Sequence, residues 1–209
     1  MIKNTLPGKF IAFEGLDGSG QSTQASLLRD FLLKQGYQVV ITKEPTKDSE
    51  AGRKIRQILD EKTQEDPAEL QKLFAKDREE HLKNTIIPAL EQGKFVISDR
   101  YFFSSFCFGA SDGVDLDWLI KLNDNFLLPD LSFILKVAPR VCVERIDKRG
   151  TAKTLFEKEE KLTKVWEAYR IMPEKIENVF IIEGERSIEA IHEEIKNIIN
   201  EKIFKNSPS

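Results

Sequence analysis

The sequence is poor in cysteine and histidine, with two of each among its 209 residues. Because Cys107 and Cys142 form no C-x-x-C pair, a zinc site with thiolate ligands is excluded and a reducing compartment is favoured. The apolar stretch at residues 10–13 is too short for a signal peptide or a membrane span. The formal net charge of −3 gives no overall attraction to nucleic acid or to an anionic membrane. We therefore predict a cytoplasmic protein that binds neither nucleic acid nor membrane.

The hydrophobic pattern predicts one α/β domain over residues 1–209, with short apolar runs alternating with stretches of helical periodicity. Strands separated by helices indicate right-handed crossovers and a parallel sheet covered on both faces. Gly36 and Gly93 are expected to end helices in the left-handed conformation, and the tail at about 204–209 is expected to fray. Strands are predicted at 9–14, 38–42, 95–98, 131–137 and 179–182, and helices at 23–35, 67–91 and 187–203.

Residues 15–23 read G-L-D-G-S-G-Q-S-T and match the phosphate-binding pattern G-x-x-x-x-G-K-[ST] at all but one position. The glycines allow backbone N–H groups to close around a phosphate, and the following helix adds its positive end. The alternative is a glycine-rich turn without a ligand, but the loop lies between a predicted strand and a helix, as the pattern requires. Ser22 is then the expected Mg²⁺ ligand. The predicted ATP-binding residues are Gly15, Leu16, Asp17, Gly18, Ser19, Gly20, Gln21, Ser22 and Thr23.

Gln21 occupies the position of the lysine whose ammonium group reaches the β- and γ-phosphates. Glutamine keeps a neutral donor of about the same reach. Loss of a charge-assisted hydrogen bond costs ~1.5–3 kcal/mol, or roughly 10- to 150-fold in rate. We therefore predict an active phosphotransferase in which other cations, with Lys43 and Lys153 among the candidates, share the charge neutralisation. A catalytically inactive nucleotide-binding protein is the alternative.

Two further groups of residues have the chemistry of a phosphate-acceptor site. Asp99 and Arg100 follow a predicted strand, at the sheet edge where ligands bind in open parallel sheets. Asp99 can hold Mg²⁺ through water and Arg100 can clamp a phosphate, or the two can simply pair. Phe74 and Arg78 lie one helical turn apart, where they can stack on a base and contact it. Otherwise Phe74 belongs to the core and Arg78 reaches to the surface.

A basic cluster at residues 145–153 places four cations around Gly150 between two helical stretches. Such a segment can form a lid, about residues 145–156, that brings positive charge to a transferring phosphoryl group and excludes water. It can equally be a solvated basic loop. Adenine contacts are expected near Glu185 and Arg186.

In their order, these motifs resemble those of the thymidylate kinase family from about Lys9 to Ile199. The matching segments are F-E-G-L-D-G at 13–18, E-P-T at 44–46 (a shortened E-P-G-G-T), L-F-A-K-D-R at 73–78 and D-R-Y-F-F-S at 99–104. Arg56 follows the second of these segments. Phe156 and Glu157, then Val165 and Tyr169, resemble the helix behind the lid of that family.

The resemblance implies a P-loop nucleoside monophosphate kinase fold with a five-stranded parallel sheet covered by helices and a lid. It implies transfer of the γ-phosphoryl group of ATP to dTMP with Mg²⁺, giving dTDP and ADP for dTTP synthesis, in a homodimer. Arg145 and Arg149 would supply catalytic charge from the lid, because the phosphate loop contains no arginine. The implied catalytic residues are Asp17, Arg100, Arg145 and Arg149, the dTMP-binding residues are Asp17, Phe74, Arg78, Arg100, Ser104, Ser105 and Phe108, and the metal residues are Ser22 and Asp99.

The chain departs from the family pattern at three places, the first of which is Gln21. Phe108 and Gly109 stand where many bacterial members have Tyr-Gln, which removes polar groups near the base and the 2′ position. Leu155 stands where a third lid arginine is often found, leaving Lys153 as the nearest cation. Because of the change at 108–109, a kinase of broader specificity, acting on dUMP or another nucleoside monophosphate, is a second interpretation.

Overall fold

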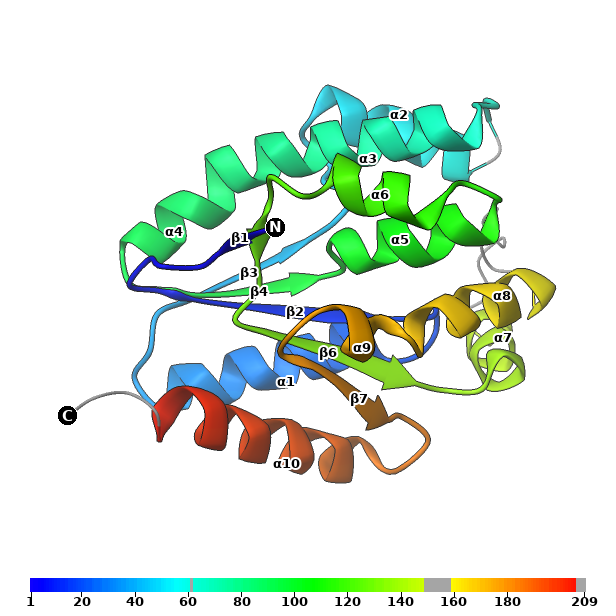
Figure 1. The fold of residues 1–209 in the computed structure, drawn as a ribbon. Coiled ribbons are helices and arrows are strands. Elements are labelled where there is room, and N and C mark those ends of the chain that lie inside the picture. Colours follow the sequence, from blue (N-terminus) through cyan, green and yellow to red (C-terminus); the bar gives the residue numbers. More distant parts are fainter. Residues whose placement is uncertain (61, 149–158, 206–209) are drawn as a thin grey trace.

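The computed structural model describes residues 1–60, 62–148 and 159–205 and is built around a five-stranded parallel sheet (Figure 1). The strand order is β3–β4–β2–β6–β7, so the chain crosses from the central strand β2 to the edge strand β3 and returns to β4 before it continues through β6 to the other edge at β7. The strands are β2 (Lys9–Gly15), β3 (Val39–Lys43), β4 (Phe95–Asp99), β6 (Leu131–Lys136) and β7 (Val179–Glu183). All five predicted strands and the parallel sheet are thus confirmed, with ends that differ by one residue at most.

Two layers of helices cover the sheet because successive side chains of each strand point to opposite faces. Ile11 and Phe13 of β2 pack with α1 (Gln21–Lys34) and α10 (Ile188–Ile199) in one hydrophobic cluster. Phe10 and Ala12 point into a second, larger cluster on the other face. That face is covered by α2 (Glu50–Leu59), α3 (Pro67–His81), α5 (Phe102–Ser111), α6 (Leu116–Leu122) and α8 (Glu159–Tyr169), above the sheet in Figure 1.

The remaining elements connect or extend these layers. α3 continues through a π-helical turn, Leu82–Ile86, into α4 (Ile87–Glu91), so the single helix expected at 67–91 is one rod with a π segment inside it. α10 continues in the same way into a second π segment, Asn200–Phe204. The short elements are β1 (Ile2–Lys3), which pairs with β5 (Leu127–Leu128), together with α7 (Pro139–Asp147) and α9 (Met172–Lys175).

The predicted helix ends and the tail can be compared with the structure. Gly36 and Gly93 have φ angles of 85° and 73°, which confirms both left-handed positions. Phe204, expected to begin a fraying tail, instead stacks on Tyr37 with ring centroids 5.3 Å apart, because an aromatic ring gains by covering the exposed end of the sheet. The rest of the expected tail from 206, and residues 149–156 of the expected lid, lie outside the described residues.

Candidate active site

The loop at residues 15–23 connects β2 to α1 in a conformation that favours glycine. Gly15 and Gly18 have φ angles of 140° and 84°, which residues with side chains rarely adopt. Space is restricted as well, because a Cβ atom on Gly18 would stand 2.7 Å from the carbonyl oxygen of Cys142 on α7. α1 begins at Gln21, so its free N–H groups and positive end point at the loop. The backbone therefore has the form of an anion cradle.

The side chain of Gln21 folds back onto this loop. Its Nε2 donates a hydrogen bond to the carbonyl oxygen of Gly15 at 2.8 Å, and its Oε1 accepts one from Arg100 Nη2 at 3.3 Å. The residue is 6% exposed. Gln21 therefore joins the loop to the arginine at the end of β4, in place of the cation that usually occupies its position.

The two predicted metal residues lie together at the sheet edge. Ser22 Oγ donates to Asp99 Oδ2 at 2.5 Å, and Lys43 Nζ donates to the same oxygen at 2.7 Å. Asp99 Oδ1 is buried and has no hydrogen-bond partner within the described part of the chain. A hydroxyl and a carboxylate are ligands of the kind that Mg²⁺ prefers, so the pair fits this ion. No cluster of three or more His, Cys, Asp or Glu among the described residues could hold a metal alone, so water and phosphate would complete its coordination.

Arg100 lies between the loop and the first turn of α5. It has a φ angle of 74°, an uncommon value for a residue with a side chain. Its Nη1 donates to the carbonyl oxygen of Gly15 at 3.0 Å and to Ser104 Oγ at 2.8 Å, and its Nη2 donates to Asp17 Oδ1 at 2.9 Å. Burial acts against the charge on Arg100, but the carboxylate of Asp17 contributes to raising its pKa above the ordinary value. The guanidinium group therefore stays charged.

Glu14, the residue before the loop, is a buried carboxyl group that sequence reasoning did not single out. Its Oε1 accepts from the Tyr101 N–H at 2.8 Å, and its Oε2 accepts from Ser104 Oγ at 2.6 Å and from the Tyr169 hydroxyl at 3.0 Å. Burial raises the pKa of Glu14 to about 7, against the opposing effects of these hydrogen bonds and of Arg100. Glu14 thus joins β2 to the segment after β4 and to α8.

A cavity of about 330 Å³ opens beside Arg100. It is bounded by the loop, the ends of β3 and β4, and the helices α2, α3 and α5. All seven residues predicted to bind dTMP line it, so the fold brings together side chains from three separate parts of the sequence. The lining residues are Asp17, Lys43, Glu44, Pro45, Arg56, Leu59, Gln71, Phe74, Arg78, Arg100, Tyr101, Ser104, Ser105 and Phe108.

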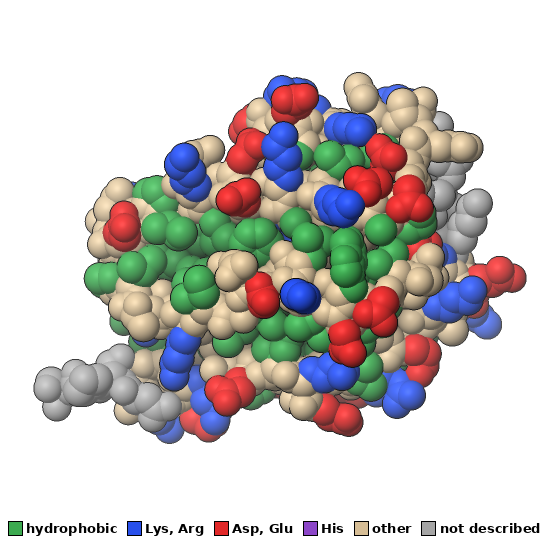
Figure 2. All heavy atoms as spheres, turned by 45° about the horizontal axis from the view of Figure 1, so that its top comes forward, with side chains coloured by type: hydrophobic (Ala, Val, Ile, Leu, Met, Phe, Trp, Pro, Cys, Tyr) green, Lys and Arg blue, Asp and Glu red, His purple; other side chains and the backbone are tan. Residues whose placement is uncertain are grey.

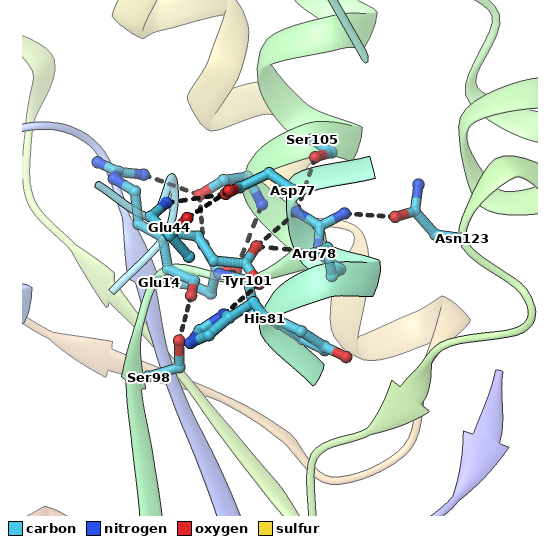
Figure 3. A network of polar contacts seen from close by, with 12 residues as sticks. Glu14, Glu44, Asp77, Arg78, His81, Ser98, Tyr101, Ser105 and Asn123 are labelled. Carbon is cyan, nitrogen blue, oxygen red and sulfur yellow. Dashed lines mark hydrogen bonds and ion pairs between the residues drawn. The ribbon is translucent and has the colours of Figure 1, made fainter. Parts of the chain in front are cut away.

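Arg78 is held in the cavity wall by a buried polar network (Figure 3). Its Nε and Nη2 lie 2.9 and 2.8 Å from Glu44 Oε2, and its Nη2 also donates to Ser105 Oγ at 3.1 Å. Its Nη1 donates to Asn123, and His81 contacts the other oxygen of Glu44 at 3.0 Å. Arg78 and Glu44 side chains are 1% and 3% exposed. The guanidinium is therefore fixed before any ligand arrives.

The neighbouring residue, Asp77, holds the E-P-T segment against α3. Asp77 accepts from the N–H and the hydroxyl of Thr46 at 2.8 and 2.5 Å, and from Ser49 Oγ at 2.5 Å. This contact places Glu44 and Pro45 at the cavity. Ser49 also caps α2 through the Gly52 N–H at 2.7 Å, so α2 and α3 share one anchoring point.

A second cavity, also of about 330 Å³, opens on the other side of the loop. Arg145, in the last turn of α7, lines it and lies 3.4 Å from the Gly18 carbonyl oxygen. Arg186 lines it too, whereas Glu185 accepts from the Ala138 N–H at 2.8 Å. The other lining residues are Gly18, Ser19, Gly20, Thr23, Gln24, Leu135, Gly184, Ile188 and Ile191. Of the other predicted lid residues, Arg149, Lys153, Leu155, Phe156 and Glu157 lie outside the described residues.

Several residues of the site were missed by sequence reasoning. Gln71 precedes Phe74 by three positions on α3, so helical periodicity could have placed it on the same face. Glu14 belongs to the F-E-G-L-D-G motif, and a glutamate at the end of a predicted buried strand was the available signal. Asn123 carried no local signal, because it lies 45 positions from Arg78 in the sequence.

The fold and the two cavities define the class of protein. A parallel sheet carries a phosphate loop after its central strand, with one cavity on each side of that loop and an arginine of the neighbouring strand beside it. This is the arrangement of a P-loop nucleoside monophosphate kinase, in which a donor and an acceptor nucleotide meet at the loop.

Comparisons with known proteins identify the family. The sequence profile of the thymidylate kinase family matches residues 13–195. A probable thymidylate kinase of Pyrococcus horikoshii is 41% identical over 95% of this chain and 99% of its own length. The thymidylate kinase of Caldicellulosiruptor saccharolyticus is 37% identical over 96% and 100%. The structure of the Candida albicans enzyme superimposes with a TM-score of 0.80 at 25% identity, over 95% of this chain and 93% of that one. The chain belongs to the thymidylate kinase family, and its activity is the phosphorylation of dTMP.

Proposed function

We propose that this kinase binds ATP and dTMP on opposite sides of the loop at 15–23 and transfers the phosphoryl group with Mg²⁺. An oxygen of the dTMP phosphate attacks the γ-phosphorus of ATP, and the bond from that phosphorus to the β,γ-bridging oxygen breaks. The products are dTDP and ADP. Arg100 is the observation that carries this proposal, since one guanidinium lies 3.0 Å from the loop carbonyl of Gly15 and also lines the acceptor cavity. Phosphoryl transfer of this kind depends on positioning and charge neutralisation rather than on a protein nucleophile.

The acceptor side has a group for each part of the nucleotide. Phe74 offers an aromatic face for the base, and the fixed guanidinium of Arg78 offers a donor to a base carbonyl. Arg100 binds the phosphate, helped by Ser104, and Asp17 accepts from the 3′-hydroxyl of the sugar. Because Asp17 is paired with Arg100 at 2.9 Å, an incoming phosphate competes with this carboxylate for the arginine. Ser105 and Phe108 complete the cavity wall.

Cations on both sides of the loop replace the missing lysine. Arg145 lies beside the loop at Gly18, and Lys43 lies at the sheet edge beside Asp99. We assign Arg145, together with Arg149 of the lid, to the charge of the transferring group. Residues 145–147 form the last turn of α7, so the proposed lid begins within a helix.

Mg²⁺ would be held by Ser22 directly and by Asp99, whose carboxylate lies 2.5 Å from the serine hydroxyl. When bound, the ion would neutralise charge on phosphate oxygens. Asp99 Oδ1 has no partner among the described residues, so this carboxylate can face such an ion while its Oδ2 keeps the contact with Lys43, which also lines the acceptor cavity.

We propose a homodimer in the reducing cytosol. Hydrophobic side chains form a band across one face of the molecule (Figure 2), and Leu116, Trp118 and Ile120 of α6 are only half-buried. An apolar band of this kind supports self-association. Cys107 and Cys142 are both buried and unpaired, in keeping with reducing conditions. No helix among the described residues could span a membrane. Sedimentation analysis tests the dimer, and a monomer at micromolar concentration would contradict it.

An assay of ADP release from Mg²⁺-ATP across nucleoside monophosphates tests the function. We expect turnover with dTMP, with dUMP as the next substrate because it differs only by the 5-methyl group. Equal use of dTMP and dUMP would favour the broader-specificity interpretation. The Candida albicans enzyme, whose structure is similar, has a broad substrate specificity, which supports testing for it here. A preference for purine acceptors, or ATP binding without dTDP formation, would contradict the proposal.

A further inference from the structure

Gln71 is a buried residue in the wall of the acceptor cavity whose side-chain amide oxygen has no partner among the described residues. It lies on α3 and is 1% exposed. Its Oε1 is buried without a hydrogen-bond partner among the residues that the structure describes. Buried side-chain amides are nearly always paired, so an unpaired oxygen on a residue that lines a cavity needs an explanation. A ligand that donates a hydrogen bond would provide one.

The position of Gln71 is set by two helices. On α3 it shares one face with Phe74 and Arg78, at spacings of three and seven residues, and all three line the cavity. On α5 it faces Gly109, where a Cβ atom would stand 3.1 Å from Gln71 Cγ and 3.0 Å from Leu119. Glycine at 109 therefore leaves the room that the glutamine side chain occupies.

Gln71 lies at the end of the cavity away from the phosphate-binding arginine. Arg100 stands just before α5 begins, whereas Gly109 lies two turns along that helix, about 10 Å further at 1.5 Å per residue. The neighbours of Gln71 at this end include the aromatic ring of Phe74 and the guanidinium of Arg78. A neutral amide beside a stacking platform faces the base of a nucleotide rather than its phosphate.

We propose that Gln71 is a specificity-determining residue that reads the imide edge of the pyrimidine. Its Oε1 accepts the N3–H of thymine, and its Nε2 donates to a carbonyl oxygen beside that N3–H. A carboxamide matches this pattern because it presents one acceptor and one donor side by side. The inference rests on the proposed dTMP binding and adds a residue to which the sequence analysis gave no role.

The test uses an acceptor whose base cannot donate from N3. In N3-methylthymidine monophosphate a methyl group replaces the N3–H proton, so both carbonyl groups and the stacking faces of the base are kept while the donor is lost. Cytosine is less informative, because a rotated carboxamide can match its edge as well. We expect native protein to prefer dTMP over the N3-methyl analogue by roughly 10- to 100-fold in kcat/KM, the range for a neutral hydrogen bond whose loss leaves a buried acceptor unpaired.

Gln71→Leu removes the amide and keeps a similar volume. The variant should lose roughly 10-fold or more of kcat/KM for dTMP, and its preference for dTMP over the analogue should fall to about 2-fold. Titration calorimetry with both nucleotides should show the same loss of discrimination in binding. The control is Gln57→Leu, an exposed glutamine on α2, which should leave the ratio unchanged.

The outcomes separate the two proposals. If native protein forms no dTDP from dTMP, the proposed function fails. If it forms dTDP and Gln71→Leu keeps the native ratio between dTMP and the analogue, the function stands and the role of Gln71 is overturned. A purely structural role would lower the turnover of both acceptors equally and leave the ratio unchanged. Should Gln71→Leu fail to fold, Gln71→Met with the same two acceptors gives the same decision.

Discussion

The phosphate loop and the acceptor cavity are neighbours, but they are built in different ways. The loop is one run of residues, 15–23, whose backbone N–H groups and glycine conformations form the cradle. The cavity is made by side chains from several elements, and its buried pair of Glu44 and Arg78 has contacts in place before any ligand binds. The donor half, which is formed by backbone groups, can therefore tolerate a side-chain exchange such as glutamine for lysine at 21. The acceptor half depends on individual side chains.

The largest effect is expected at Arg100, where the two halves meet. Arg100→Met removes donors to the loop, to Asp17 and to Ser104, along with the cation for the acceptor phosphate. We expect kcat to fall by about 10³-fold, the scale for loss of a transition-state cation. Steady-state kinetics with dTMP and ATP measures this. Arg29→Met, an exposed arginine of α1 paired with Asp30, should change kcat less than 2-fold. If kcat falls by less than 10-fold in Arg100→Met, this residue does not link the phosphate loop to the acceptor cavity in catalysis.

A second variant tests how far the acceptor cavity depends on its buried ion pair. Glu44→Gln leaves the buried cation of Arg78 without its counter-charge, so we expect a loss of ~3–5 kcal/mol in the free energy of unfolding. Urea denaturation measures it. Glu69→Gln breaks the exposed pair with Lys72 and should cost under ~1 kcal/mol. Under conditions where the Glu44 variant stays folded, the KM for dTMP should rise while ATP affinity is kept. Equal loss of both would contradict a division into two halves.

A pH series tests Glu14, which links the loop strand to the acceptor segment. The folded pKa of about 7 lies above the ordinary glutamate value of 4.5. Between pH 4.5 and 7 the native state therefore binds a proton that the unfolded chain has lost, so stability falls as pH rises through this window. The difference amounts to about 3 kcal/mol. Glu14→Gln should abolish this component, so the native and variant unfolding free energies should diverge with pH. Parallel curves from pH 4.5 to 7.5 would refute the raised pKa.

The smallest effect is expected from restoring the usual loop residue. Gln21→Lys places an ammonium group beside Arg100, where like charges repel, while Arg145 and Lys43 already supply cations nearby. We expect kcat to rise by less than about 10-fold. This is below the roughly 10- to 150-fold change in rate that gaining a charge-assisted hydrogen bond would otherwise give. Single-turnover measurement of the transfer step decides this. A rise of 100-fold would show that the native loop is impaired and that no other cation has taken over.

The loop could be predicted from the sequence more completely than the acceptor cavity. The strands were predictable because buried parallel strands form short apolar runs, and the loop was predictable because all its parts are adjacent. Phe74 and Arg100 could be weighed only as alternatives until the family resemblance was considered. The roles of Gln71 and Asn123 could not be predicted from the sequence, because their neighbours in the site lie on other elements and the sequence pattern near each is that of an ordinary helix. The π-helical turns within the long helices left no local signal either.

One feature of the sheet bears on how such enzymes diverge. β2 and β4 are adjacent and in register, with Phe13 opposite Asp99, so the loop after one strand and Arg100 after the other are separated by a fixed strand spacing of about 4.8 Å. The side chains at 71 and 74, which we propose to face the base, instead stand on α3, beyond the sheet. Mutations there can change which base is accepted without altering the strand spacing that separates the loop from Arg100. Base preference can therefore diverge in this scaffold while the register of the two strands is kept.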